Sequence, residues 1–86
     1  MKQIKTRYEI ECSASNTITR HANSLRGVLR HLRRMQGMVS ILDRQTDTEF
    51  FLGSPRQGYN LIKTMLGNYG GNEDIVMSIF ISNSRV

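Results

Sequence analysis

The stretch TITRHANSLRGVLRHLRRM, residues 17–35, decides the predicted fold because its apolar side chains recur at steps of three and four. These apolar positions are Ile18, Ala22, Leu25, Val28, Leu29, Leu32 and Met35. A helix of 3.6 residues per turn places such side chains on one stripe, which can pack against a core. Polar residues 15–17 can cap the start of this helix, and Gly37 suits its end. We therefore predict one amphipathic helix over residues 17–35.

The face of this helix opposite the apolar stripe is positively charged. Between Cys12 and Leu42 the chain has five arginines and two histidines but no Asp or Glu, and this segment accounts for the net charge of +5. The arginines, which share an arc of roughly 100° or lie at its edge, are Arg20, Arg26, Arg30, Arg33 and Arg34. Solvated helices usually mix charges, because each Glu/Lys pair four residues apart adds about 0.2 to 0.5 kcal/mol. An arginine face without acids therefore indicates an anionic partner, and His31 lies close enough to join it.

Alternation of apolar and polar residues predicts four strands around this helix. The strands cover residues 4–12, 38–42, 48–52 and 74–82, and the middle two form a hairpin across a polar link. Ser54, Pro55 and Gln57 give the signature of a second helix, which continues to Leu66. The predicted order is strand, helix, strand, strand, helix, strand.

This order predicts an α+β domain of the ferredoxin-like α/β plait type (βαββαβ), with two helices on one face of a four-stranded antiparallel sheet. The other face of the sheet is then open. Val76 and Phe80 are expected on that open face together with Phe51 or, in the other hairpin register, Phe50. Such a face can stack bases or form an interface, for example in a homodimer. No motif in the chain indicates a particular family with this topology.

The length and composition indicate a single small domain over residues 1–86. No apolar run is long enough to span a membrane, and the first residues do not resemble a secretory signal. Cys12 is the single cysteine, which fits a reducing compartment, so we expect a cytoplasmic protein. We expect no cofactor and no metal, because His21 and His31 lie ten positions apart and lack the four-residue spacing of a helical metal pair.

These features predict a non-enzymatic module that binds nucleic acid or a nucleoprotein surface. The expected contacts are Arg20, Arg26, Arg30, His31, Arg33 and Arg34, with Arg56 at the start of the second helix holding a further anion. RNA is favoured over DNA, because the plait has no recognition helix built for the major groove.

Two alternatives stay open from the sequence. One is a small inhibitor or adaptor, of the kind found in phages and other mobile elements, that blocks an acidic patch of a host nuclease, polymerase or defence complex. A weaker one is a small ribonuclease that uses arginine with His31 and Tyr69, although no catalytic triad is recognisable.

Overall fold

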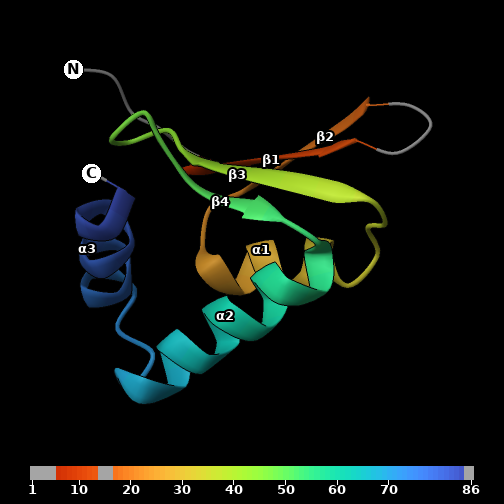
Figure 1. The fold of residues 1–86 in the computed structure, drawn as a ribbon. Helices are drawn as coiled ribbons and strands as arrows, with labels where there is room; N and C mark the ends of the chain where they lie inside the picture. The colour runs from red at the N-terminus through yellow and green to blue at the C-terminus, as the bar shows by residue number, and fades with distance from the viewer. Residues whose placement is uncertain (1–5, 14–16, 85–86) are drawn as a thin grey trace.

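The computed structural model describes residues 6–13 and 17–84, which form one four-stranded antiparallel sheet and three helices (Figure 1). The strands are β1 (Tyr8–Ser13), β2 (Thr17–Ala22), β3 (Met38–Asp43) and β4 (Thr48–Gly53), in the spatial order β2-β1-β3-β4. The helices are α1 (Leu25–Leu32), α2 (Pro55–Asn68) and α3 (Glu73–Ser84). In Figure 1 the three helices lie on one side of the sheet, and α3 packs against β4 and α2.

The α+β class and the four-stranded antiparallel sheet are confirmed, but the plait order is matched only in part. The chain order is ββαββαα among the described residues. The 38–52 hairpin and the second helix lie where they were predicted. Ser54 and Gln57 form the predicted capping box, in which each side chain bonds the backbone of the other residue. Residues 4 and 5, where the first strand was expected to begin, lie outside the described residues.

The prediction of one helix over residues 17–35 is wrong at its start, because residues 17–22 form β2. β2 pairs with β1 so that Ile18 lies opposite Cys12 and Arg20 opposite Ile10. Side chains of directly paired residues share a face of the sheet, so Ile18 and Arg20 point toward the helix layer. The β-branched residues at positions 17–19 favour an extended backbone, and the hairpin with β1 satisfies its hydrogen bonds.

The helix that follows is shorter than predicted and has a different cap. The side chain of Ser24 accepts a hydrogen bond from the backbone N–H of Gly27 at 3.1 Å, so α1 begins at Leu25. Of the predicted caps, Thr17 lies in β2 and residues 15–16 lie outside the described residues. The apolar side chains Leu25, Val28 and Leu32 of α1 are buried against the sheet and α2.

The predicted last strand is also wrong, because residues 73–84 form the helix α3. The side chain of Asn72 caps this helix, because its oxygen accepts a hydrogen bond from the backbone N–H of Ile75 at 3.2 Å. Two acidic residues occupy the first turn of α3, where their negative charge interacts favourably with the positive end of the helix dipole. Val76 and Phe80 are four residues apart, so they lie on one helical face, and both are buried in the core. They are therefore not available for the predicted interface on an open sheet face.

A bulge in β4 removes the third predicted interface residue from the open face. The register of β3 and β4 shifts between Ile41 and Leu42, so that Phe50 and Phe51 both point toward the helices. The Phe50 ring packs edge-on against Tyr8, with 6.0 Å between ring centroids, and lies 5.3 Å from the Phe80 ring. The ring of Phe51 contacts α2 at Gly58.

One carboxylate joins the beginning of α3 to β1 and α1. Glu73 Oε1 accepts a hydrogen bond from the Tyr8 hydroxyl at 2.5 Å and another from the backbone N–H of Leu25 at 3.1 Å. Burial, together with this bond to a carboxylate, raises the pKa of Tyr8 far above its usual value, so the hydroxyl stays a donor. Glu73 thus helps to fix both the end of the sheet and the first turn of α1.

Candidate nucleic-acid interface

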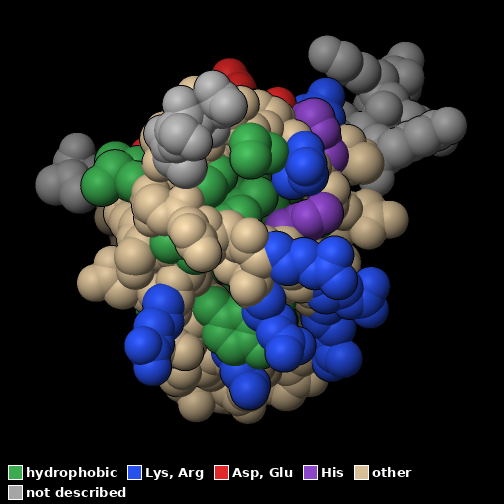
Figure 2. All heavy atoms as spheres, turned by 90° about the vertical axis from the view of Figure 1, so that its right-hand side faces the viewer, with side chains coloured by type: hydrophobic (Ala, Val, Ile, Leu, Met, Phe, Trp, Pro, Cys, Tyr) green, Lys and Arg blue, Asp and Glu red, His purple; other side chains and the backbone are tan. Residues whose placement is uncertain are grey.

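Three adjoining hollows surround the C-terminal end of α1. Their volumes are about 410, 550 and 340 Å³. The first and second share His31 and Arg34, the second and third share Arg33, and the first and third share Met35. We call this surface the arginine groove and define it by its basic residues, which are Arg20, Arg30, His31, Arg33, Arg34 and Arg56. Figure 2 shows the face of the molecule on which lysine and arginine side chains crowd around apolar patches.

The chain places these residues together from three elements. Arg30 and His31 occupy the last turn of α1, Arg33 caps its end, and Arg34 follows in a turn. Cations at this end of a helix interact favourably with its dipole. Arg20 comes from β2, the neighbouring edge strand, and Arg56 from the first turn of α2.

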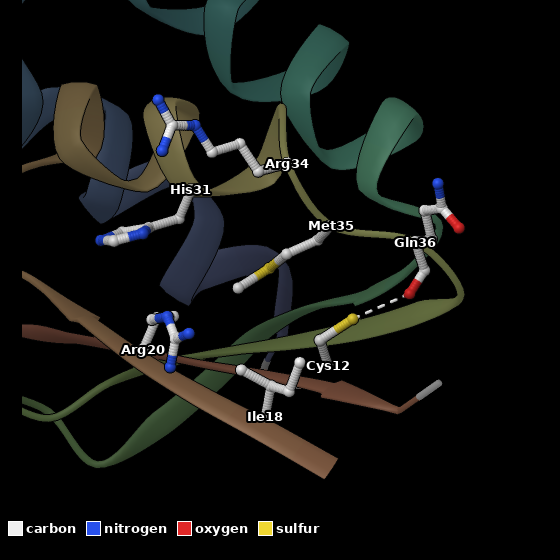
Figure 3. Close-up of a pocket in the computed structure, with 7 residues that line it drawn as sticks. All are labelled: Cys12, Ile18, Arg20, His31, Arg34, Met35 and Gln36. Carbon is white, nitrogen blue, oxygen red and sulfur yellow. Dashed lines mark hydrogen bonds between the residues drawn. The ribbon is translucent and has the colours of Figure 1, made fainter. Parts of the chain in front are cut away.

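The first hollow lies between β2 and the end of α1 (Figure 3). Ile18 and Arg20 rise from β2, and Met35 and His31 extend toward them from above, while the guanidinium of Arg34 points outward. A ring nitrogen of His31, Nε2, lies 3.2 Å from the backbone oxygen of His21, so it carries a proton and donates there. The hollow therefore has apolar walls and a cationic rim.

The third hollow lies between α1 and α2 and has a similar composition. Arg33 and Arg56 supply its charge, and Leu32 and Tyr59 supply apolar surface. Lys63 Nζ lies 5.7 Å from the centroid of the Tyr59 ring, which brings a further cation close to this end of the groove.

The carboxylates of the chain lie elsewhere. Asp43 pairs with Arg7 at 2.9 Å and Glu9 with His21 at 3.2 Å, and Glu73 is bonded to Tyr8. Glu11 and Glu49 point to the sheet face away from the helices, as their strand partners show. Within residues 6–13 and 17–84, no arginine of the groove forms a salt bridge, and no Asp or Glu lines the three hollows. Among the described residues, the arginines of the groove thus have no carboxylate partner.

The structure brings together six of the seven predicted binding residues and separates one. Arg26 lies in the first turns of α1 and reaches the loop before α3, where a Cβ built on Gly71 would lie 3.6 Å from its Nη2 atom. It lines none of the three hollows. Sequence reasoning placed Arg26 with the others because residues 26, 30 and 33 share one face of a helix, but the hollows surround only the C-terminal end of α1 and Arg26 lies at its beginning.

Sequence reasoning also missed the apolar residues of the groove. Ile18 and Met35 were assigned to the apolar stripe of the long helix, and Tyr59 was not named among the site residues. In the structure Ile18 is 41% exposed, and Met35 and Tyr59 are half-buried and line hollows. The signal in the sequence was that these residues lie close to arginines. Periodicity alone could not distinguish an apolar residue of the groove from one of the core.

The residues named for a ribonuclease are not brought together. His31 lines the groove, whereas Tyr69 caps the end of α2 and lines none of the three hollows. Among the residues that the structure describes, no three His, Cys, Asp or Glu side chains are grouped so that they could hold a metal ion. None of the described helices has the length and apolar character needed to cross a bilayer.

In comparisons with known proteins, no family model, no curated protein and no solved structure matches this chain. The fold and the arginine groove are therefore the basis for assigning a function.

Proposed function

We propose that the protein is a non-enzymatic module that binds nucleic acid through the arginine groove. The observation that carries the proposal is a continuous concave surface with five arginines and a histidine in which no described carboxylate takes part. Guanidinium groups bind phosphate oxygens through paired, charge-assisted hydrogen bonds. A polyanion with regularly spaced phosphates can engage several of them at once, whereas a single small anion cannot.

The shape of the groove favours RNA, or another strand outside a regular duplex, over the major groove of DNA. Reading the major groove requires a protruding helix or ribbon. Here the arginines surround hollows, and α1 has only eight residues and lies against the sheet and α2. A flexible strand can follow such a concave surface, so we favour single-stranded or structured RNA as the ligand.

Binding of a fluorescent RNA strand of about ten nucleotides, followed by anisotropy, tests the proposal. If all five arginines of the groove contact phosphates, the slope of log K against log salt is expected to be about −3.5, since each contact on a single strand contributes about −0.7. The double variant Arg30→Gln/Arg33→Gln is expected to bind more weakly and to reduce the slope by about 1.4.

The matched control is Arg26→Gln/Arg44→Gln, which removes the same two charges from exposed residues outside the hollows. Both variants lower the net charge from +5 to +3. If the control weakens binding as much as the groove variant, total charge and not the groove is responsible, and the proposed interface is wrong. A wild-type protein that binds no nucleic acid, but captures a protein from nuclease-treated lysate through Arg30 and Arg33, supports the adaptor alternative instead.

A further inference from the structure

We infer that the first hollow of the groove, between β2 and the end of α1, receives the base of an unpaired nucleotide. The inference rests on the proposed function and names the part of the nucleic acid that the site holds. It predicts that binding depends on exposed bases and not on phosphate charge alone.

The composition of this hollow is the first reason. A surface that only attracts phosphates needs cations, yet Ile18 and Met35 form apolar walls beside Arg20 and Arg34. Ile18 is 41% exposed on an edge strand, at a position where its neighbours in β2 are polar. A planar base can cover these two side chains and remove their apolar surface from water.

The size and the rim of the hollow are the second reason. Its volume of about 410 Å³ lies in the range of pockets that hold small organic molecules. Arg20 donates one hydrogen bond to the backbone oxygen of Thr19, which leaves further N–H groups for the edge of a base. The guanidinium of Arg34 points away from the apolar walls in Figure 3, and Arg34 also lines the second hollow, where Arg30 and Arg33 can hold the adjoining phosphates.

The pairing state of the ligand follows from this arrangement. In a duplex the bases are stacked and paired inside, so only phosphates and sugars reach a concave protein surface. An unpaired nucleotide can turn its base into the hollow while its phosphates stay on the arginines. The site is therefore expected to prefer single strands, loops and bulges to a continuous double helix.

The experiment compares two RNA strands of equal length and charge, one with ordinary bases and one with abasic sites throughout, by anisotropy at fixed salt. The base-bearing strand is expected to bind the wild-type protein about fivefold to tenfold more tightly, at the lower end of what one stacked base contributes. The neutral variant Ile18→Thr/Met35→Gln is expected to lose this difference and to bind the abasic strand as the wild type does. Threonine keeps the β-branched shape that suits a strand, and glutamine keeps the unbranched shape of methionine.

The matched control is Leu52→Thr/Leu61→Gln, which makes similar changes at an exposed strand residue and an exposed helix residue that line none of the hollows. It is expected to keep the full preference for bases. Equal binding of both strands by the wild-type protein overturns the inference but leaves the proposed function standing. A preference that persists in the Ile18→Thr/Met35→Gln variant places the base elsewhere and also overturns it, whereas no binding to either strand overturns the proposed function itself.

Discussion

Asp43 is a buried carboxylate at the end of β3, and its oxygens accept hydrogen bonds from three residues. Arg7 donates two bonds of 2.9 Å, through Nε and Nη2, and the Gln45 backbone and Thr46 hydroxyl donate at 3.0 and 3.1 Å. Burial by itself raises the pKa of a carboxyl, but these bonds outweigh it and hold the pKa of Asp43 below its usual value. The ionised form is thus more stable in the folded protein than in the unfolded chain.

We expect Asp43→Asn to lower the free energy of unfolding by about 3 kcal/mol at neutral pH, because it breaks a largely buried ion pair. A carboxyl with a lowered folded-state pKa stabilises the protein above the unfolded-state pKa, and this contribution is lost as the pH falls through the folded-state pKa. The difference between variant and wild type should therefore shrink below about pH 4. Urea unfolding at several pH values measures it.

The control for this prediction is Asp47→Asn, which makes the same chemical change at an exposed residue of the same turn. Asp47 has a φ of 57°, a backbone conformation that asparagine also accepts, so little change in stability is expected. A loss of stability in Asp43→Asn that stays constant with pH would contradict the assigned role of the ion pair.

At the scale of elements, the contact between β4 and α2 depends on a glycine. A Cβ added at Gly58 would lie 2.9 Å from Cε2 of Phe51, which is closer than carbon atoms normally approach. Gly67, in the last turn of the same helix, has no atom within 4 Å of the corresponding point. Substitution of the two glycines therefore compares the effect of side-chain packing with the effect of helix propensity.

We expect Gly67→Ala to raise the free energy of unfolding by about 0.5 to 1 kcal/mol, because alanine favours the helix. Gly58→Ala should instead lower it by about 1 to 3 kcal/mol, because the added methyl group overpacks the contact with Phe51. Thermal unfolding of both variants gives the comparison. If the two substitutions stabilise equally, Phe51 does not pack on α2 as described.

The elements also show how far the sequence could predict the fold. The hairpin and the start of α2 were predictable because local signals, the polar link and the capping box, agreed with the tertiary structure. The structure of segment 17–22 was not predictable, because six residues of mixed apolar and polar character fit a strand as well as a helix. Pairing with β1 decides in favour of the strand. For α3, the alternation of apolar and polar residues over 74–82 predicted a strand, and the capping side chain of Asn72 was not considered.

The grouping of the predicted binding residues follows only in part from their spacing in the sequence. Arg30, Arg33 and Arg34 lie within five residues, so any local structure keeps them together. Arg20 and Arg56 join the groove because β2 and α2 lie next to the end of α1. The spacing of residues in the sequence gives no information about this tertiary contact. The interface residues Phe51, Val76 and Phe80 were mispredicted because a bulge and a helix replaced two regular strands.

At the scale of the whole molecule, the charge is distributed unevenly. The arginine groove lies on the helix side, while Glu9, Glu11 and Glu49 lie on the opposite face of the sheet. Among the described residues, Arg30 has like charges three and four positions away, at Arg26, Arg33 and Arg34, without a carboxylate partner. Within α1 the pair Arg26 and Arg30 costs about 0.2 to 0.5 kcal/mol, and Arg33 and Arg34, which follow the helix, add to the repulsion.

We expect salt to stabilise the free protein, because it screens this repulsion. Raising the ionic strength from about 0.01 M to about 0.15 M shortens the screening length from about 30 Å to about 8 Å. The free energy of unfolding should rise by about 0.5 to 1 kcal/mol. Arg30→Gln should respond less to added salt than the wild type, because it has one charge fewer in this cluster. Chemical denaturation with urea, which is uncharged, at the two salt concentrations checks this, and a wild-type protein weakened by salt would contradict it.

The bond from Leu25 to Glu73 makes the start of α1 depend on a residue far along the chain. The two residues are 48 positions apart, so the first turn of α1 cannot gain this carboxylate until residue 73 has left the ribosome. Before that point the N–H of Leu25 and the hydroxyl of Tyr8 lack their shared acceptor. The first turn of α1 therefore reaches its final hydrogen bonding only after the beginning of α3 has been synthesised.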